Sequence, residues 1–151
     1  MWKTSPSPKT LRGDARVLLE SCAGWNSRQA ARRITQFLDR ELAATGLGVA
    51  QLGLLAEIAV IADDRLGALA ERTGLDQSTL SRNLRTLERG GLVEIAAVES
   101  DLRRRAVWLT ETGARRLEAA IPLWRKANAH LAKRLTHLAS GLAKETENLV
   151  L

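Results

Sequence analysis

One stretch of the chain decides the fold: Leu69-Ala70-Glu71-Arg72-Thr73-Gly74-Leu75-Asp76-Gln77-Ser78-Thr79-Leu80-Ser81-Arg82-Asn83-Leu84. It predicts a short helix over Leu66–Arg72, a turn at Thr73–Leu75 and a second helix over Asp76–Arg89. Asp76 is a favoured N-cap residue, and Gly90-Gly91 is suited to end the second helix. Because two short helices joined by a tight, glycine-containing turn form a helix-turn-helix, the stretch predicts that unit.

The second predicted helix has one apolar and one polar face, because its leucines repeat at intervals of four and three. The side chains that we expect to pack the unit together are Leu69, Ala70, Leu75, Leu80, Leu84 and Leu87. The side chains left on the outer face are Gln77, Ser78, Thr79, Ser81, Arg82 and Arg85. Small hydroxyls, an amide and arginines can enter the DNA major groove and bond base edges. The same face would also suit a solvated helix of an all-helical protein.

A basic hairpin is predicted directly after this unit. Leu92–Val98 and Ala106–Leu109 are β-branched or partly alternating and predict two strands. The polar segment Glu99–Arg105 between them ends in Arg103-Arg104-Arg105, so we expect a loop with a basic tip. A basic loop beside a DNA-reading helix can contact phosphates or the adjacent minor groove, which attracts arginine.

Helices are predicted upstream of the unit. Residues 1–10 hold two of the three prolines and predict a flexible arm. A helix is expected over 11–23, and Gly24 and Asn26-Ser27 should interrupt or bend it before an amphipathic helix that runs to Leu42. After Gly46 and Gly48, the very apolar segment Val49–Val60 predicts a helix that is buried on most sides.

The C-terminal segment carries a heptad pattern. The apolar residues that keep it are Leu117, Ile121, Trp124, Leu131, Leu135, Leu138, Leu142 and Leu149. Such a repeat is typical of helix–helix association, and Pro122 should kink or break the helix. We therefore expect a homodimer in which the N- and C-terminal helices interlock, although the stripe could instead pack only against its own chain.

Composition narrows the function classes. Lys and Arg total 23 against 17 Asp and Glu, a net charge of +6, which predicts a polyanionic partner. No apolar run approaches the ~20 residues that span a bilayer, and no signal peptide is evident, so we expect a cytoplasmic protein. There is no Gly-rich phosphate loop or Ser/His/Asp set, which predicts no enzyme, metal or cofactor. His130 and His137, seven apart, are more often surface residues than metal ligands.

At this point the chain resembles the MarR family of winged helix-turn-helix transcriptional regulators. The resemblance rests on the quoted stretch and on Leu87–Val93, Asp101–Ala106 and Leu109–Gly113 after it. Upstream, Gly46–Gln51 resembles the family's entry into its second helix, although Thr or Ser is commoner where Gly48 stands. The resemblance covers about residues 25–135, and its specificity lies in the combined order of these segments.

The resemblance implies a mainly α fold with a small β-hairpin wing and N- and C-terminal dimerisation helices. It places a single domain over 11–151, with the winged-helix lobe at about 46–110 and the dimerisation helices at about 11–45 and 111–151. It implies a repressor or activator that binds a palindromic double-stranded DNA operator as a homodimer, with Ser78, Thr79, Ser81 and Arg82 facing DNA. It also implies that Asp101 pairs with Arg103 to brace the wing, while an arginine from Arg103–Arg105 enters the minor groove.

The family usually binds aromatic acids and similar small molecules between the DNA-binding lobe and the helical base. The candidate lining of such an effector pocket is Cys22, Trp25, Arg28, Arg32 and Trp124. An arginine can pair with a carboxylate, and a tryptophan offers a flat apolar surface. An alternative is a redox switch on Cys22, the only cysteine, although the tyrosines used by the family's peroxide sensors are missing. A different class is a helical dimer that binds protein partners without DNA.

Overall fold

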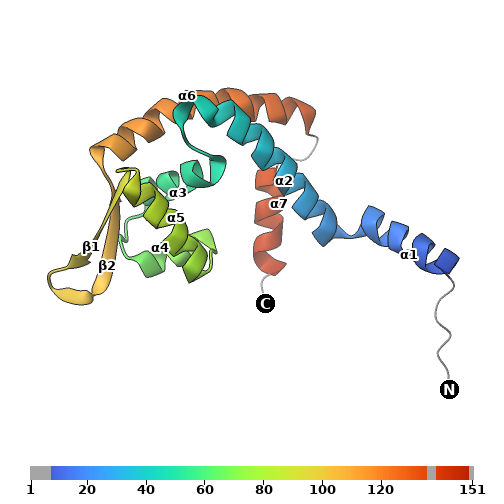
Figure 1. Ribbon diagram of the computed structural model, residues 1–151, viewed down its shortest axis with the longest axis horizontal. Coiled ribbons are helices and arrows are strands. Elements are labelled where there is room, and N and C mark those ends of the chain that lie inside the picture. The colour runs from blue at the N-terminus through green and yellow to red at the C-terminus, as the bar shows by residue number, and fades with distance from the viewer. Residues whose placement is uncertain (1–7, 136–138, 150–151) are drawn as a thin grey trace, which may run out of the picture. The chain divides into compact units, whose positions relative to one another are not determined.

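The computed structural model describes residues 8–135 and 139–149, and these form helices and one two-stranded sheet (Figure 1). The chain divides into two compact units, residues 1–37 and residues 38–151, which are described separately below. The mainly α fold class with a β-hairpin wing is confirmed.

The first unit contains α1, Pro8–Ser21, and most of α2, Ala23–Leu42. Helix α1 begins at Pro8, inside the segment predicted to be an arm; proline is tolerated in the first helical turn. The prediction that Gly24 and Asn26-Ser27 interrupt the helix is wrong, because the break falls at Cys22. The Asn26 backbone N–H bonds the Cys22 carbonyl at 3.0 Å, and its side-chain amide donates to the Glu20 carbonyl at 3.1 Å, so Asn26 bridges the break.

The second unit contains the predicted helix-turn-helix and wing. Its elements after α2 are η1 (Ala43–Thr45), α3 (Val49–Val60), α4 (Leu66–Thr73), α5 (Gln77–Arg89), β1 (Val93–Val98), β2 (Asp101–Leu109), α6 (Glu111–Arg134), α7 (Ala139–Thr146) and η2 (Glu147–Leu149). Gly74 has a φ of 64°, which lets the chain leave α4 through a left-handed turn. Helix α5 ends where Gly91, also at positive φ, turns the chain into β1.

The core of this unit is built on α3. Helix α3 packs against α4, α6 and β2, and the side chains of Leu52, Leu54, Leu55 and Ile58 are buried. The predicted packing face of α5 is confirmed, since Leu80, Leu84 and Leu87 are all buried in the same cluster. The prediction that α3 is buried on most sides is wrong, because one face is exposed along its whole length. The exposed residues of that face are Ala50, Gly53, Ala56, Ala59 and Val60. The helix-turn-helix is thus held by its leucines, which leaves the opposite face of α5 free.

The second strand of the wing is longer than the sequence predicted, and residues 102–104 of it have no partner on β1. Strands β1 and β2 pair antiparallel from Val93 opposite Leu109 to Ala97 opposite Arg105, with a shift in register between Ala97 and Val98. Only Glu99 and Ser100 turn between the strands. The prediction that the three arginines form a loop tip is therefore wrong: they lie in β2, because strand pairing continues almost to a two-residue turn.

The base of the wing is tied to the segment before α4. The Val107 N–H donates to the Asp64 carbonyl at 2.9 Å, and Arg65 forms an isolated antiparallel bridge with Ala106. Figure 1 shows the hairpin extending past α4 and α5, which both contact it. The wing is consequently fixed beside the helix-turn-helix at its base.

Helix α6 begins with the predicted cap. The Thr110 hydroxyl accepts from the Gly113 N–H at 3.0 Å and donates to the Gly91 carbonyl at 2.6 Å. Helix α6 is not broken at Pro122. The heptad residue Leu138 lies outside the described residues.

Over the part of the chain that is described, no single helix is long and apolar enough to cross a membrane. The bent pair Ala23–Thr45 and Val49–Val60 reaches that length and hydropathy only when the two helices are taken together.

Candidate nucleic-acid interface

The start of α5 is held by a dense set of hydrogen bonds to Asp76. Its carboxylate accepts from the Thr79 N–H at 2.9 Å and from the hydroxyls of Ser78 and Thr79, each at 2.7 Å. The hydroxyl bonds from Ser78 and then Thr79 hold the pKa of Asp76 well below its ordinary value. The N-cap prediction is confirmed, and two of the predicted DNA-facing hydroxyls donate within the cap, which leaves their oxygens as acceptors.

The outer face of α5 forms a basic, open groove of about 490 Å³. Its lining residues are Ser78, Ser81, Arg82, Arg85 and Arg89. Arg82 and Arg85 are exposed, and neither guanidinium forms an ion pair within the described residues. Both groups are therefore available to an external anion, which arginine binds through a planar fork of donors.

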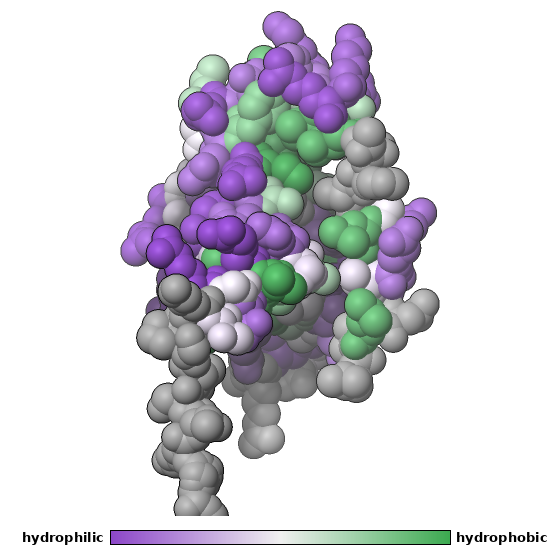
Figure 2. Space-filling view, turned by 90° about the vertical axis from the view of Figure 1, so that its right-hand side faces the viewer, coloured by the Kyte–Doolittle hydropathy of each residue, from purple (hydrophilic) through white to green (hydrophobic). Residues whose placement is uncertain are grey.

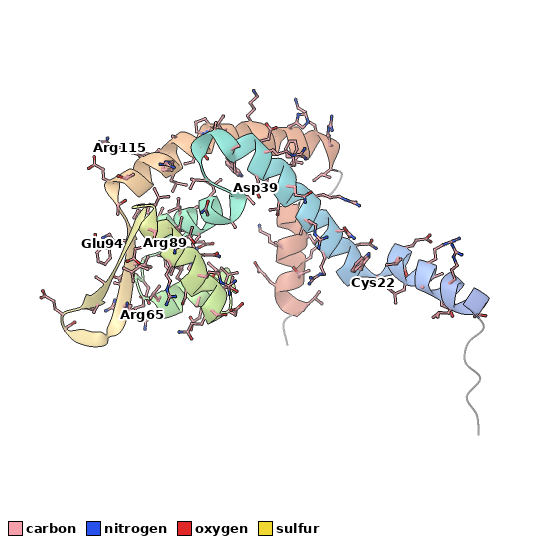
Figure 3. The ribbon with its side chains drawn as sticks, in the orientation of Figure 1. Cys22, Asp39, Arg65, Arg89, Glu94 and Arg115 are labelled. Carbon is pink, nitrogen blue, oxygen red and sulfur yellow. The ribbon has the colours of Figure 1, made fainter. Side chains whose placement is uncertain are left out.

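Arg89 belongs to the same face and was missed by the sequence reasoning. It lies at the C-terminal end of α5 (Figure 3), where its Nη2 donates to Thr86 Oγ1 at 3.5 Å. The signal was available, because Arg89 follows Arg85 by four residues and Arg82 by seven, which places all three on one side of a helix.

A second groove, of about 1080 Å³, runs between the beginning of α4 and the wing. Gln77, Arg104 and Arg105 all line it, together with the acidic Asp63 and Asp64. The predicted site residues at the start of α5 and in β2 are thus brought together. The two arginines differ in state: Arg105 is exposed and opposes Ala97 across the hairpin, whereas Arg104 pairs with Asp64, with Nη2 and Oδ1 2.5 Å apart.

Arg65, labelled in Figure 3, forms the other ion pair in this groove. Its Nε lies 2.8 Å from both carboxylate oxygens of Asp63, and this bond lowers the pKa of Asp63 to about 2. Of these two ion pairs, the one between Arg104 and Asp64 joins the wing to the segment before α4, whereas the one between Arg65 and Asp63 lies within that segment. The side chains of Asp101 and Arg103 lie outside the described part of the structure, so the brace between them stays a prediction.

The base of the wing also depends on a close approach at Gly113. A Cβ atom at this position would lie 1.9 Å from the Leu92 carbonyl oxygen, far inside contact distance. The Thr110 N–H donates to the same carbonyl at 3.1 Å. Because α6 begins against the end of the loop that follows α5, only glycine fits at this position.

The residues predicted for an effector pocket fall into different units. Trp124 lines an apolar cavity of about 540 Å³ between α3 and α6, together with Val49, Leu52, Ile121 and Arg125. The other four predicted residues, Cys22, Trp25, Arg28 and Arg32, belong to the first unit. There the Trp25 N–H lies 3.5 Å from the Cys22 Sγ. His137 lies outside the described residues, and within those residues no three His, Cys, Asp or Glu side chains form a metal-binding group.

A helix-turn-helix followed by an anchored hairpin, with exposed arginines on the outer face of the second helix, defines a winged helix-turn-helix DNA-binding protein. Comparison with known families matches residues 45–104 to the MarR family. A search of curated proteins finds no match to the sequence.

Solved structures extend the match over most of the chain. The M. tuberculosis transcriptional regulator MosR in complex with DNA is 34% identical, with a TM-score of 0.76 over 85% of this chain and 93% of that chain. A second MosR structure is 32% identical, with a TM-score of 0.72 over 87% and 94%. A mutant E. coli MarR complexed with operator DNA shares the fold at 23% identity, with a TM-score of 0.75 over 89% and 98%. The chain belongs to the MarR family of DNA-binding transcriptional regulators.

Proposed function

We propose that this protein is a homodimeric, ligand-responsive repressor that binds a specific operator by placing α5 in the major groove. The observation that carries the proposal is the pair of exposed guanidinium groups of Arg82 and Arg85 on α5, which have no ion pair within the described residues. Arginine bonded to guanine edges is the commonest specific base contact. MosR, which resembles this chain at 34% identity, has been solved with DNA, in agreement with this role.

The proposed wing contact comes from Arg105. It is exposed and has no ion pair within the described residues, and the base of its strand is fixed to Asp64 and Arg65. A guanidinium on an anchored strand loses less freedom on binding than one on a mobile loop. Arg105 is therefore the wing arginine that we assign to the DNA backbone or the minor groove.

The proposed dimer would cover apolar surface that the single chain leaves exposed. In α1, Leu11, Val17, Leu18 and Leu19 are between 49% and 62% exposed. Trp25 of α2 and Leu123 and Trp124 of α6 are also exposed, and Figure 2 shows hydrophobic residues at the surface among hydrophilic ones. Large exposed apolar patches are rare in monomers and mark interaction surfaces. A second copy of the chain is the partner that we propose.

The proposed effector site is the apolar cavity between α3 and α6. Its walls are mostly aliphatic, with Trp124 and Arg125 as the aromatic and the charged side chain. A small aromatic anion suits such walls, since it can contact the indole face and pair with the guanidinium. Its binding would alter DNA affinity only if it favours one arrangement of the DNA-binding elements over another.

A selection experiment tests this function. The purified protein is incubated with a randomised pool of DNA duplexes, and the bound duplexes are amplified and sequenced over several rounds. We expect enrichment of one site with two-fold symmetry, bound by two chains per duplex, and repression of a reporter gene placed behind that site. A pool that stays unenriched would contradict sequence-specific binding, and one chain per duplex would contradict the dimer.

A further inference from the structure

The N-terminus of α3 lacks the side-chain cap that helices ordinarily have. The residue at its N-cap position is Gly48, in extended conformation, which has no side-chain oxygen to accept from the first turn. The first N–H groups of a helix need acceptors from outside the helix. Gln51 supplies one half of the usual arrangement by reaching back, since its Oε1 accepts from the Gly48 N–H at 3.0 Å.

The missing acceptor comes from another helix. Asp39 lies on α2, nine residues before Gly48 by sequence number (Figure 3), and its Oδ1 accepts from the Val49 N–H at 2.7 Å. A carboxylate at this place also meets the positive end of the helix dipole. Asp39 therefore supplies an acceptor to the first N–H of α3, whereas a side chain at position 48 would bond the second or third.

The two residues fit each other sterically. A Cβ atom on Gly48 would lie 3.2 Å from Asp39 Oδ1 and 3.7 Å from its Cγ, the first of which is tighter than an ordinary contact. A side chain at position 48 would thus crowd the Asp39 carboxylate that bonds the Val49 N–H. The glycine leaves the space, and the aspartate of α2 occupies it.

The capped end of α3 lies beside the apolar cavity, and α3 itself pairs with the first helix of the helix-turn-helix. Val49, whose N–H is bonded by Asp39, lines the apolar cavity, as do Leu52 and Gly53 in the next turn. Further along α3, Glu57 pairs with Arg72 in the last turn of α4, with Oε2 and Nε 2.8 Å apart. The start of α3 consequently fixes one wall of the cavity and, through α3, the first helix of the helix-turn-helix.

We propose that Asp39 is a positioning residue, which accepts from the first N–H of α3 and so ties the end of α2 to the start of the DNA-binding lobe. The bond couples α2 to α3. It rests only on the geometry of the chain, so it stands or falls independently of the proposed repressor function.

A double-mutant cycle on the full-length protein tests the proposal. Asp39→Ala should lower Tm by about 2–4 °C, as for loss of one helix cap, and Asp39→Asn, which keeps an acceptor oxygen, should lower it less. In a Val49→Pro background, where the N–H that Asp39 bonds is absent and proline is tolerated at the first helical position, Asp39→Ala should leave Tm unchanged. Asp14→Ala is the matched control, because Asp14 is an exposed carboxylate on α1.

Hydrogen exchange locates the effect. In Asp39→Ala the Val49 amide should exchange faster, and the amides at the start of α5 should keep their rate. Equal Tm losses from Asp39→Ala in the wild-type and Val49→Pro backgrounds, or a Val49 amide that exchanges at the wild-type rate in Asp39→Ala, would overturn the assignment. No DNA enters the measurement, so failure of DNA binding cannot produce either result.

Discussion

Helix α5 and strand β2 are both rich in arginine, but their arginines differ in whether they form an ion pair. On α5, Arg82 and Arg85 project from a helix that is already secured by buried leucines and by the Asp76 cap, and they have no ion pair within the described residues. On β2, Arg104 pairs with Asp64, whereas Arg105 beside it is exposed and has no such pair in the described part of the chain. The arginines without an ion pair are the ones that we propose bind DNA, whereas Arg104 holds the wing.

The difference arises from what fixes each element. A helix that is anchored by one apolar face can leave every charge of the other face free. A two-stranded ribbon has little core of its own and is marginal alone, so it uses a charged side chain and backbone bonds to join the body. Arg104 consequently serves the structure of the wing, and Arg105 is the wing arginine that we propose contacts DNA.

The anchor of the wing gives the largest expected effect. Gly113→Ala places a methyl group 1.9 Å from the Leu92 carbonyl oxygen, and overpacking against backbone should cost about 3 kcal/mol or more of the free energy of unfolding. Urea denaturation measures this cost. Gly67→Ala is the control, because nothing lies within 4 Å of the added Cβ and alanine favours the helix by up to ~1 kcal/mol. Similar stabilities for the two variants would contradict the close approach.

Arginine on the outer face of α5 gives the next largest expected effect. Arg82→Ala should weaken binding to the selected duplex by about 1–3 kcal/mol, as for one bidentate base contact, and should affect a scrambled duplex less. Arg115→Ala is the control, since Arg115 is an exposed arginine paired with Glu111 within α6 (Figure 3). If Arg82→Ala weakens both duplexes equally, Arg82 contacts phosphates and does not read bases.

Substitutions of the two neighbouring arginines of β2 separate contact with DNA from anchoring of the wing. Arg105→Ala should reduce the slope of log affinity against log salt by about 1, as for one lost phosphate contact, with little change in stability. Arg104→Ala should leave DNA affinity nearly unchanged and cost under about 1 kcal/mol of stability, because its ion pair is partly exposed. Salt titrations and urea denaturation of both variants separate these outcomes. The reverse pattern would show that Arg104 is the DNA contact.

The cap of α5 has the smallest expected effect and a definite pH dependence. The pKa of Asp76 is lowered in the folded state, so its stabilising contribution is present above the ordinary carboxyl pKa of about 4 and is lost as pH falls below that value. The Tm difference between wild type and Asp76→Ala should be constant from neutral pH to about pH 4 and shrink at lower pH. A difference that grows on acidification would contradict the cap.

Much of this fold follows from periodicity and caps in the sequence. The leucine spacing correctly predicted the buried face of α5, and Asp76 and Thr110 mark helix starts that the structure confirms. These features are local, and each depends on residues within a few positions of one another. The candidate DNA face was predictable for the same reason, because it is the complement of the leucine face.

What the sequence did not reveal depends on distant partners. The polar run Glu99–Arg105 suggested a loop, but Arg105 pairs with β1, and the side chain of Arg104 pairs with Asp64, far away in the sequence. Likewise, Gly48 looked like a departure from the family pattern, and only the structure shows that Asp39 supplies the missing acceptor. Neither partner could be assigned from spacing along the chain.

We expect arginines without an ion pair to bind DNA and paired ones to hold the fold, and a titration of two double variants separates these roles. The variants Arg82→Ala/Arg85→Ala and Arg72→Ala/Arg115→Ala each remove two helical arginines, the first pair without and the second with an ion pair within the described residues. Affinity for the selected duplex is measured at one salt concentration. We expect the first variant to lose about ten-fold or more in affinity, as for lost base contacts, and the second to stay within about two-fold of wild type. Equal losses from both variants would contradict the assignment of DNA binding to the arginines without an ion pair.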